Sequence, residues 1–496
     1  MRAIRPGRSA PRCGSAPAAG GSQAPEAAET TAAPGTTASA EAAGAAPRAR
    51  SARRDLYAAA AAVLLFTAAL LVGRSIEEHQ GTLHLRWPPL YAYWLPHWGP
   101  GTPAAAAVAV AVVAYGPVLA ARLRWRTLLP AAWGASMAWI WSLALIDGWH
   151  RGAAERLTTK YEYLQAVDRV RESGLGTTLR TFTDHILLGP DHWPAHVAGH
   201  PPGAVLTFAG LDAVGLGGGA WAAAWCVTVA SSAAVAVLVA VRALCGEATA
   251  RRAAPFLVLA PAAVWLGVSA DGYFAAVSAW AVALLALAAT RAVRAPRAAA
   301  LGSGVLFGLV CHLSYGLVLM GVVCLGVLAS ARTLRPVPYV LLGMAPWFAA
   351  FTAGGFWWYD GYTTLVERYY QGAGGIRPAS YFVWANLAAN VAVVGLAVVA
   401  GLRRTSAALP GAVRGLRHAP ATGSAALALL VTAAGCALLA ADLSGMSKAE
   451  TERIWLPFTL WLLPAAALLP ARGARWWLGA QAALALTVNH LVITGW

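Results

Sequence analysis

A chain of 496 residues with 58% hydrophobic and only 12% charged residues carries about half the charge expected of a water-soluble globular protein, which excludes that class. Apolar runs of about 17–25 residues recur from Leu56 onward, and each is long enough to cross ~30 Å of hydrocarbon. The composition predicts an all-α, polytopic integral membrane protein, and we attribute the net charge of +16 to its topology and its N-terminal tail rather than to nucleic-acid binding.

The N-terminal segment, residues 1–54, differs from the rest of the chain. It is built of Ala, Pro, Gly, Ser and Thr with scattered Arg and has no hydrophobic periodicity, so it is not expected to bury a core. Its apolar run starts only after Arg53 and Arg54, so the segment lacks the apolar centre of a signal peptide. We expect a disordered cytoplasmic tail followed by an uncleaved first span.

The apolar runs predict about thirteen transmembrane helices. Two of them lie in an N-terminal part, 55–127, the main group lies in 128–470, and the last helix lies in 471–496. The predicted spans are 56–73, 103–121, 128–146, 220–241, 254–270, 273–290, 298–312, 315–331, 338–353, 380–401, 422–441, 454–470 and 476–494.

Arginine distribution decides whether the apolar stretch 203–217, which is short, Gly-rich and contains Asp212, also crosses the membrane. Cytoplasmic connections collect Lys and Arg. If 203–217 is a juxtamembrane or re-entrant helix, the arginine clusters fall on the cytoplasmic side, and Glu247 is the only acidic residue among them. These connections are 122–127, 242–252, 291–297, 332–337, 402–418 and 471–475. We therefore predict a cytoplasmic N-terminus, an extracellular segment 147–202 and a multi-pass cell-membrane protein.

The extracellular segment 147–202 is much longer than an ordinary connection. In "KYEYLQAVDRVRESGLG", Tyr163, Ala166, Val167 and Val170 share one helical face and the charged residues face elsewhere, which predicts an amphipathic helix ended by Gly174. The segment closes with "AHVAGHPPG" at 195–203.

Histidines spaced by four in this segment have the spacing of metal ligands on one helix. Pro194 and the Pro-Pro pair at 201–202 would interrupt any helix that held His192, His196 and His200, so no metal ligands are assigned. No cofactor is predicted with certainty, and a divalent metal ion is left open.

Three motifs carry a resemblance to a known family. "GHPPG" at 199–203, after a long first outer segment with an acidic residue near its start, resembles the His-Pro-Pro-Leu motif of the GT-C superfamily of membrane glycosyltransferases. That superfamily includes protein O-mannosyltransferases and the lipid A aminoarabinose transferase. Asp271 in "SADGYF" resembles an acidic residue at the outer end of a later span, and "SKAETERIWLPF" is similar to a segment of uncharacterised actinobacterial relatives. The resemblance covers roughly residues 128–460.

The resemblance implies an all-α fold with a long first catalytic outer segment and an inverting transferase that takes a sugar from a polyprenyl-phosphate donor. Its acceptor would be a glycan, lipid or protein of the cell envelope. Such a reaction needs a carboxylate base, for which we prefer Asp147 and keep Glu162 as the alternative. Many members carry a pair of acidic residues where this chain has Asp147-Gly148, which leaves the base open.

Donor-phosphate or substrate contacts are expected from polar residues on the extracellular side, because charge develops on the departing phosphate. A lipid-linked saccharide flippase or secondary transporter is the alternative function, and it would show mid-membrane charges, inverted repeats or broken helices. The candidate contacts are Arg151, His200, Asp271, Arg377, Lys448, Glu450 and Arg453.

Overall fold

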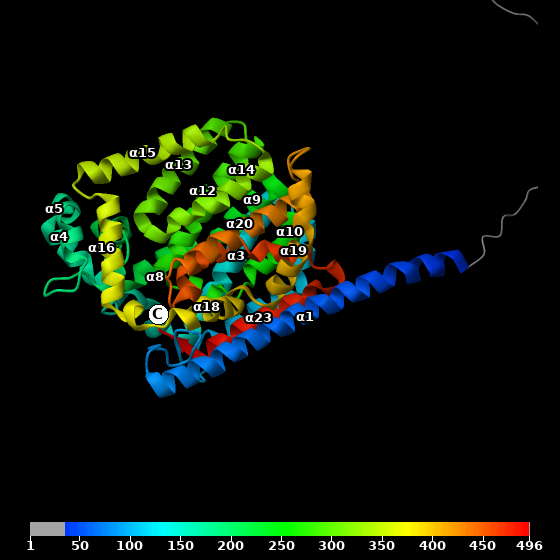
Figure 1. The fold of residues 1–496 in the computed structure, drawn as a ribbon, viewed down its shortest axis with the longest axis horizontal. Helices are drawn as coiled ribbons and strands as arrows, with labels where there is room; N and C mark the ends of the chain where they lie inside the picture. The colour runs from blue at the N-terminus through cyan, green and yellow to red at the C-terminus, as the bar shows by residue number, and fades with distance from the viewer. Residues whose placement is uncertain (1–34, 496) are drawn as a thin grey trace, which may run out of the picture. The chain divides into compact units, whose positions relative to one another are not determined.

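The computed structural model describes the backbone of residues 35–495 and the side chains of residues 50–495. The chain divides into two units between Ala52 and Arg53, and the second unit holds the helical bundle described below (Figure 1). Helix α1 begins at Gly35, inside the segment predicted as a disordered tail. Residues 1–34 of that prediction lie outside the described residues.

The described part is mostly helical and contains almost no strand, as the composition predicted. Its two strands are β1 (Ala92–Trp94) and β2 (Val492–Thr494). The helices of the first half are α1 (Gly35–Gln80), α2 (Thr102–Arg122), α3 (Trp125–Ala144), α4 (Val167–Ser173), α5 (Leu175–Thr181), α6 (Ala195–Ala198), α7 (Gly203–Ala213), α8 (Gly219–Ser231), α9 (Ala233–Cys245), α10 (Glu247–Val258), α11 (Ala263–Leu266) and α12 (Ala270–Thr290). Those of the second half are α13 (Pro296–Leu313), α14 (Met320–Ala331), α15 (Val337–Ala353), α16 (Trp358–Gln371), α17 (Ala373–Ile376), α18 (Ala379–Val394), α19 (Leu396–Gly415), α20 (Gly423–Leu443), α21 (Thr451–Ile454), α22 (Leu456–Thr459) and α23 (Ala474–Leu491).

Seven helices in the described residues are long and apolar enough to cross a membrane, or up to nine if each of two bent pairs is one span. This falls short of the thirteen continuous spans expected from the sequence. The seven are Arg50–Gln80, Thr102–Arg122, Trp125–Asp147, Gly219–Cys245, Ala270–Thr290, Pro296–Leu313 and Gly423–Leu443. Each of them contains one of the predicted spans or most of its residues.

Two predicted spans belong to sharply bent pairs. The chain bends by 73° between α15 and α16, and by 111° between α18 and α19. The second bend lies at Gly395, whose φ of +80° is readily adopted only by glycine. Gln481 of α23 donates from Nε2 to the Val394 carbonyl oxygen at 2.9 Å, which satisfies an acceptor at the end of α18.

Two further predicted spans, 254–270 and 454–470, are broken into short helices. Prolines explain the breaks, because Pro261 follows the end of α10 and Pro464 follows α22, and proline cannot donate a helical hydrogen bond. Both stretches are almost wholly buried among other helices. Irregular backbone is tolerated at membrane depth only when protein surrounds it, so these segments lie in the interior of the bundle.

Helix α12 forms the centre of the bundle. Of the residues in its most apolar stretch, 78% are buried, and the helix packs against α8, α9, α13 and α14. Alanine occupies many of its buried positions, and such small side chains allow neighbouring helices to approach closely. Asp271 in its first turn is therefore held by a rigid element.

The N-terminal part predicted as two extra helices is tied to the rest of the second unit by polar contacts. Asp55 forms ion pairs with Arg403 and Arg404 of α19 at 2.7 and 2.6 Å.

Strand β1 pairs antiparallel with β2, so the last predicted span, 476–494, ends in a strand rather than in a helix. No pattern in the sequence predicts this pairing.

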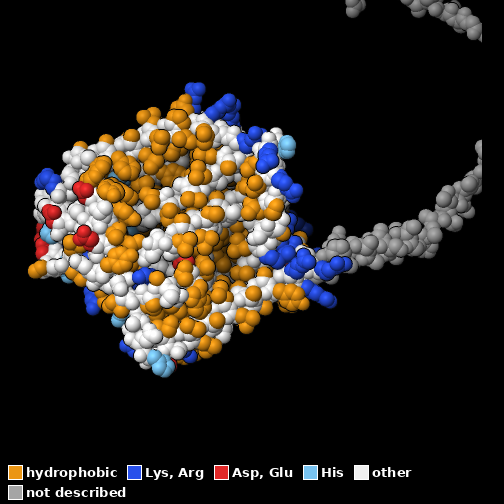
Figure 2. Space-filling model, viewed as in Figure 1, with side chains coloured by type: hydrophobic (Ala, Val, Ile, Leu, Met, Phe, Trp, Pro, Cys, Tyr) orange, Lys and Arg blue, Asp and Glu red, His pale blue; other side chains and the backbone are white. Residues whose placement is uncertain are grey.

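Charged side chains separate along the bundle. Figure 2 shows lysines and arginines gathered at the end near α10 and α19, whereas the visible acidic side chains lie mostly near α4, α5 and α16. A wide apolar surface lies between these two ends in the same view. This arrangement is typical of a membrane protein and agrees with the arginine asymmetry in the sequence.

Candidate functional site

The segment 147–202 folds into a series of short helices and turns. In α4 and the turn before it, Tyr163, Ala166, Val167 and Val170 are buried, and Gly174 follows the helix with a φ of +74°. The buried face is the one that the hydrophobic pattern predicted. Packing of this face on α7 fixes the position of Glu162, the residue immediately before the turn.

The "GHPPG" stretch turns the chain from α6 into α7. Helix α7 has eleven residues, or about 16 Å, which is too short to cross ~30 Å of hydrocarbon. Gly203 begins α7 and packs against the end of α13, where a Cβ would collide with the carbonyl oxygen of His312. This close approach explains why a large apolar residue is absent at position 203.

Four side chains from four elements meet at one end of the bundle, and we call them the buried charge cluster: Glu162, His196, Asp271 and Arg453. His196 Nδ1 lies 3.0 Å from Glu162 Oε1, and Arg453 Nη2 lies 3.2 Å from His196 Nε2. Arg453 Nε lies 3.2 Å from Asp271 Oδ2. The side chains of Glu162 and Arg453 are each 4% exposed, so this is an ionic network shielded from water.

Local structure holds each member of the buried charge cluster. The Asp271 backbone N–H donates to Ser269 Oγ at the N-cap of α12, at 3.1 Å. Arg453 lies in the short helix α21, and His196 lies in α6. The backbone carbonyl oxygen of His196 accepts a hydrogen bond from His200 Nδ1 at 2.8 Å. The four side chains thus meet because the outer segment folds back onto the ends of α12 and α21.

The electrostatics favour ionised Glu162 and Arg453. Burial alone raises the pKa of Glu162, but its electrostatic and hydrogen-bond interactions with His196 and the charge of Arg453 outweigh this effect and leave the pKa below its ordinary value. Burial lowers the pKa of Arg453, but the negative charges of Asp271 and Glu162 outweigh burial, so the pKa lies above its ordinary value. Glu162 Oε2 has no hydrogen-bond partner among the described residues, so an ionised acceptor is left for a ligand.

His200 lies beside this network in its neutral form. Burial lowers its pKa to about 4 against the smaller opposing effect of Asp271. Its ring packs against Tyr163 and Phe274 at centroid distances of 5.7 and 5.5 Å. A neutral imidazole can accept or donate one hydrogen bond but adds no charge to the site.

Further predicted residues form a second group next to the cluster. Glu450 lies 3.9 Å from Arg453 Nη2 and 3.7 Å from Arg377 Nη1. Arg377 is buried and donates to the carbonyl oxygens of Leu83 and Lys448, at 2.9 and 2.8 Å. Lys448 Nζ in turn donates to the Gly374 carbonyl oxygen at 2.8 Å.

The structure places the other two candidates apart from these contacts. Asp147 ends a 3-10 turn after α3 and forms an ion pair with His97 at 2.8 Å. Arg151 is exposed, and no ion pair joins it to another residue of the described part. Thus the candidates Glu162, His200, Asp271, Arg377, Lys448, Glu450 and Arg453 come together, and Asp147 and Arg151 do not join their network of direct contacts.

Several residues at this site carry no signal in the sequence that points to them. The spacing of His196 suggests only a metal ligand, but His196 bridges Glu162 and Arg453. Arg156 donates to Thr494 Oγ1 at 2.6 Å, and Glu452 accepts from the Tyr91 backbone N–H at 2.6 Å. Their partners are far away in the sequence, so no spacing pattern could have revealed these contacts.

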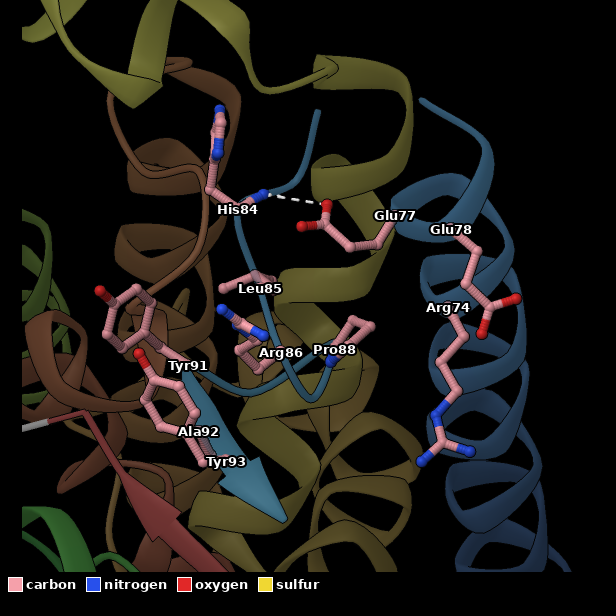
Figure 3. Close-up of a pocket in the computed structure, with 10 residues that line it drawn as sticks. All are labelled: Arg74, Glu77, Glu78, His84, Leu85, Arg86, Pro88, Tyr91, Ala92 and Tyr93. Atoms are coloured by element: carbon pink, nitrogen blue, oxygen red, sulfur yellow. Dashed lines mark hydrogen bonds between the residues drawn. The ribbon is translucent and has the colours of Figure 1, made fainter. Parts of the chain in front are cut away.

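A polar pocket of about 690 Å³ adjoins the second group. Figure 3 shows Arg74 and Glu78 of α1 on one side, Tyr91 and Tyr93 on the other, and Arg86 between them. The wall is continuous with the site, because Tyr91 bonds Glu452 through its backbone and Leu83, two residues before Leu85 of the wall, bonds Arg377. The pocket has room for a polar headgroup or a sugar.

Glu452 is expected to make stability depend on pH. Burial raises its pKa to about 7, so the folded state binds a proton that the unfolded state releases above its ordinary pKa of 4.5. Because the folded state binds more protons between these values, the free energy of unfolding falls as pH rises from about 4.5 through about 7. We expect purified Glu452→Gln and wild-type protein to have the same midpoint temperature of thermal unfolding at pH 5. At pH 8, the midpoint of the variant should be higher than that of the wild type. Equal pH dependence of the two proteins would contradict this protonation.

No metal site emerges within the described residues, where no group of three or more His, Cys, Asp or Glu side chains could hold an ion. His192 is exposed and bonds Gly189, whereas His196 and His200 point into the site described above. The divalent metal left open by the sequence therefore gains no candidate ligand set from this part of the chain.

The chain matches no model of a known protein family and no curated protein.

Proposed function

We propose that the protein is an inverting glycosyltransferase of the cell envelope that moves a sugar from a polyprenyl-phosphate donor to an acceptor on the extracellular face of the membrane. The observation that carries the proposal is the buried charge cluster. An ionised carboxylate with a vacant acceptor oxygen lies beside buried guanidinium groups, at one end of an apolar helical bundle and next to a polar pocket. The GT-C-like motifs "GHPPG" and "SKAETERIWLPF" supply His200, Glu450 and Arg453.

The proposed step assigns the base to Glu162. Its Oε2 takes the proton of the acceptor hydroxyl while the hydroxyl oxygen attacks the anomeric carbon. The bond between that carbon and the phosphate oxygen breaks, and its electron pair leaves with the lipid phosphate. Arg453 and Arg377 stabilise the charge that grows on this phosphate.

Glu162 replaces Asp147 as the preferred base in this proposal because of their partners. Asp147 already accepts from His97 at 2.8 Å, whereas one oxygen of Glu162 lacks a hydrogen-bond partner in the described part of the chain. Asp147 then orients His97, and Lys448 contributes positive charge near the donor.

A transfer assay tests the function. Purified full-length protein in detergent is incubated with a panel of radiolabelled polyprenyl-phosphate sugars, with and without membrane-extracted glycans, lipids and proteins as acceptors. We expect acceptor-dependent loss of label from one donor and its recovery in an acceptor fraction. Retention of label in every donor by folded protein would contradict the proposal.

A lipid-linked saccharide flippase or secondary transporter is the second candidate, because of the bent helix pairs. Broken helices that meet at an angle are common at transporter binding sites, and α18–α19 bends by 111°. Reconstituted liposomes distinguish the two functions. A transporter moves labelled donor across the bilayer without cleaving it, whereas a transferase cleaves it without moving it.

The proposed topology places residues 147–202 outside the cell and residues 402–418 inside. Labelling with a membrane-impermeant thiol reagent in intact cells tests this, in a background whose six native cysteines are replaced. Gly176→Cys, at an exposed position in the first turn of α5, is expected to react, and Ala407→Cys, at an exposed position of α19, is expected to react only after permeabilisation. The reverse pattern would mean that the chain is inverted or that 203–217 crosses.

A further inference from the structure

A second cavity, of about 540 Å³, lies between the C-terminal end of α2 and the N-terminal end of α23. We call it the basic pocket. Its charged lining consists of Arg122, Arg472 and Arg475, and no acidic residue lines it. All three arginines are exposed, and none forms an ion pair with another residue that the structure describes. Three positive charges therefore face one cavity without a counter-charge.

The backbone around the basic pocket favours an anion as well. Arg251 Nη1 donates to the carbonyl oxygens of Ala120 and Leu123 at 2.7 and 2.8 Å. Its positive charge offsets the partial negative charge at the C-terminal end of α2, which would otherwise repel an anion. Helix α23 has eighteen residues, and its N-cap, Gly473, provides no side chain to accept from the first turn. The positive end of this helix is thus available to the cavity.

The position of the basic pocket matches the boundary between hydrocarbon and water. Helix α2 is an apolar span that ends at Arg122, and Val118 one turn earlier forms part of the apolar wall. Trp476 is 85% exposed at the rim, and tryptophan is enriched at this depth of a membrane. The cavity therefore has a charged part at headgroup level and an apolar part below it.

We infer that the basic pocket binds the phosphate headgroup of an anionic phospholipid. Guanidinium groups bind phosphate oxygens in pairs, and basic pockets between helices at a membrane surface retain anionic lipids. The apolar wall formed by Val118 and Trp476 would contact the glycerol and the start of the acyl chains, which inorganic phosphate lacks. The inference is independent of the proposed glycosyl transfer.

Native mass spectrometry of the full-length protein in detergent tests this, with phosphatidylglycerol, phosphatidylcholine and inorganic phosphate as probes. We expect at least one phosphatidylglycerol to bind about tenfold or more tightly than phosphatidylcholine, since a charge-assisted hydrogen bond contributes about 1.5–3 kcal/mol. The double variant Arg472→Gln/Arg475→Gln should lose this preference. The charge-matched control Arg414→Gln/Arg417→Gln, whose arginines lie outside the pocket lining, should keep it.

A second variant separates occupancy of the cavity from general charge. Ala121→Trp leaves all three arginines in place and fills the cavity, so it should also lose the preference for phosphatidylglycerol. Circular dichroism melting confirms that each variant is folded. Equal lipid binding by the pocket variants and the control would overturn the inference. So would displacement of the lipid by millimolar inorganic phosphate, which would assign the pocket to the free anion.

Discussion

Glu162→Gln is expected to lower the rate of sugar transfer by about 10²–10⁴-fold, the usual loss when a general base is removed. The substitution keeps the shape of the side chain and removes its negative charge. Donor binding should stay within about threefold of wild type, because the proposed step assigns the donor phosphate to Arg453 and Arg377 rather than to Glu162. Single-turnover transfer of label and equilibrium donor binding, measured on the same preparation, separate the two effects.

Asp147→Asn is the matched control, since it removes a carboxylate that already has a partner. We expect transfer to remain within about tenfold of wild type, because the change weakens only the hold on His97. An inactive Asp147→Asn together with an active Glu162→Gln would assign the base to Asp147. Full activity in both variants would eliminate the proposed acid–base step and favour the transport function.

Arg453→Gln is expected to reduce the free energy of unfolding by about 3–5 kcal/mol, because it leaves buried carboxylates without their counter-charge. Asp271 and Glu162 both raise the pKa of Arg453, so both lose a stabilising partner. The loss should appear as a lower midpoint of thermal unfolding in detergent. Arg171→Gln provides the comparison, since Arg171 is exposed and pairs with Asp168 and Asp212 near the surface, and such contacts contribute about 0–1 kcal/mol each.

A double variant separates charge pairing from packing. Asp271→Asn/Arg453→Gln removes the guanidinium charge together with the carboxylate charge that it neutralises. The double variant should therefore lose less free energy of unfolding than the two single variants lose in sum. Strict additivity would show that the 3.2 Å contact between Arg453 and Asp271 carries no coupling. A wild-type midpoint in Arg453→Gln alone would mean that the buried charge cluster does not stabilise the fold.

Local pattern was enough to predict part of the fold. The apolar runs located the seven long helices, and the buried face of α4 followed from the spacing of Tyr163, Ala166, Val167 and Val170. These features depend on neighbours three or four residues away, which a sequence displays directly. The motif around Arg453 also placed Glu450 and Arg453 next to each other.

The remaining features depend on partners that are distant in the chain. The bend at Gly395 is supported by Gln481, and the breaks near Pro261 and Pro464 are permitted because other helices bury them. Hydropathy alone scores such stretches as continuous spans, which is why thirteen were expected. The contact of Asp147 with His97 likewise depends on a distant partner, because His97 comes from the segment between the first two spans.

The pairing of β1 with β2 has a consequence for the order in which the molecule is assembled. Tyr93 on the wall of the polar pocket is opposite Ile493, about 400 residues further along the chain, so this wall gains its partner only after α23 has been made. Contacts between such distant segments form late and slowly. During synthesis the wall of the polar pocket therefore stays incomplete until β2 has been made, and a cut in the chain before Val492 would leave this wall without its neighbouring strand.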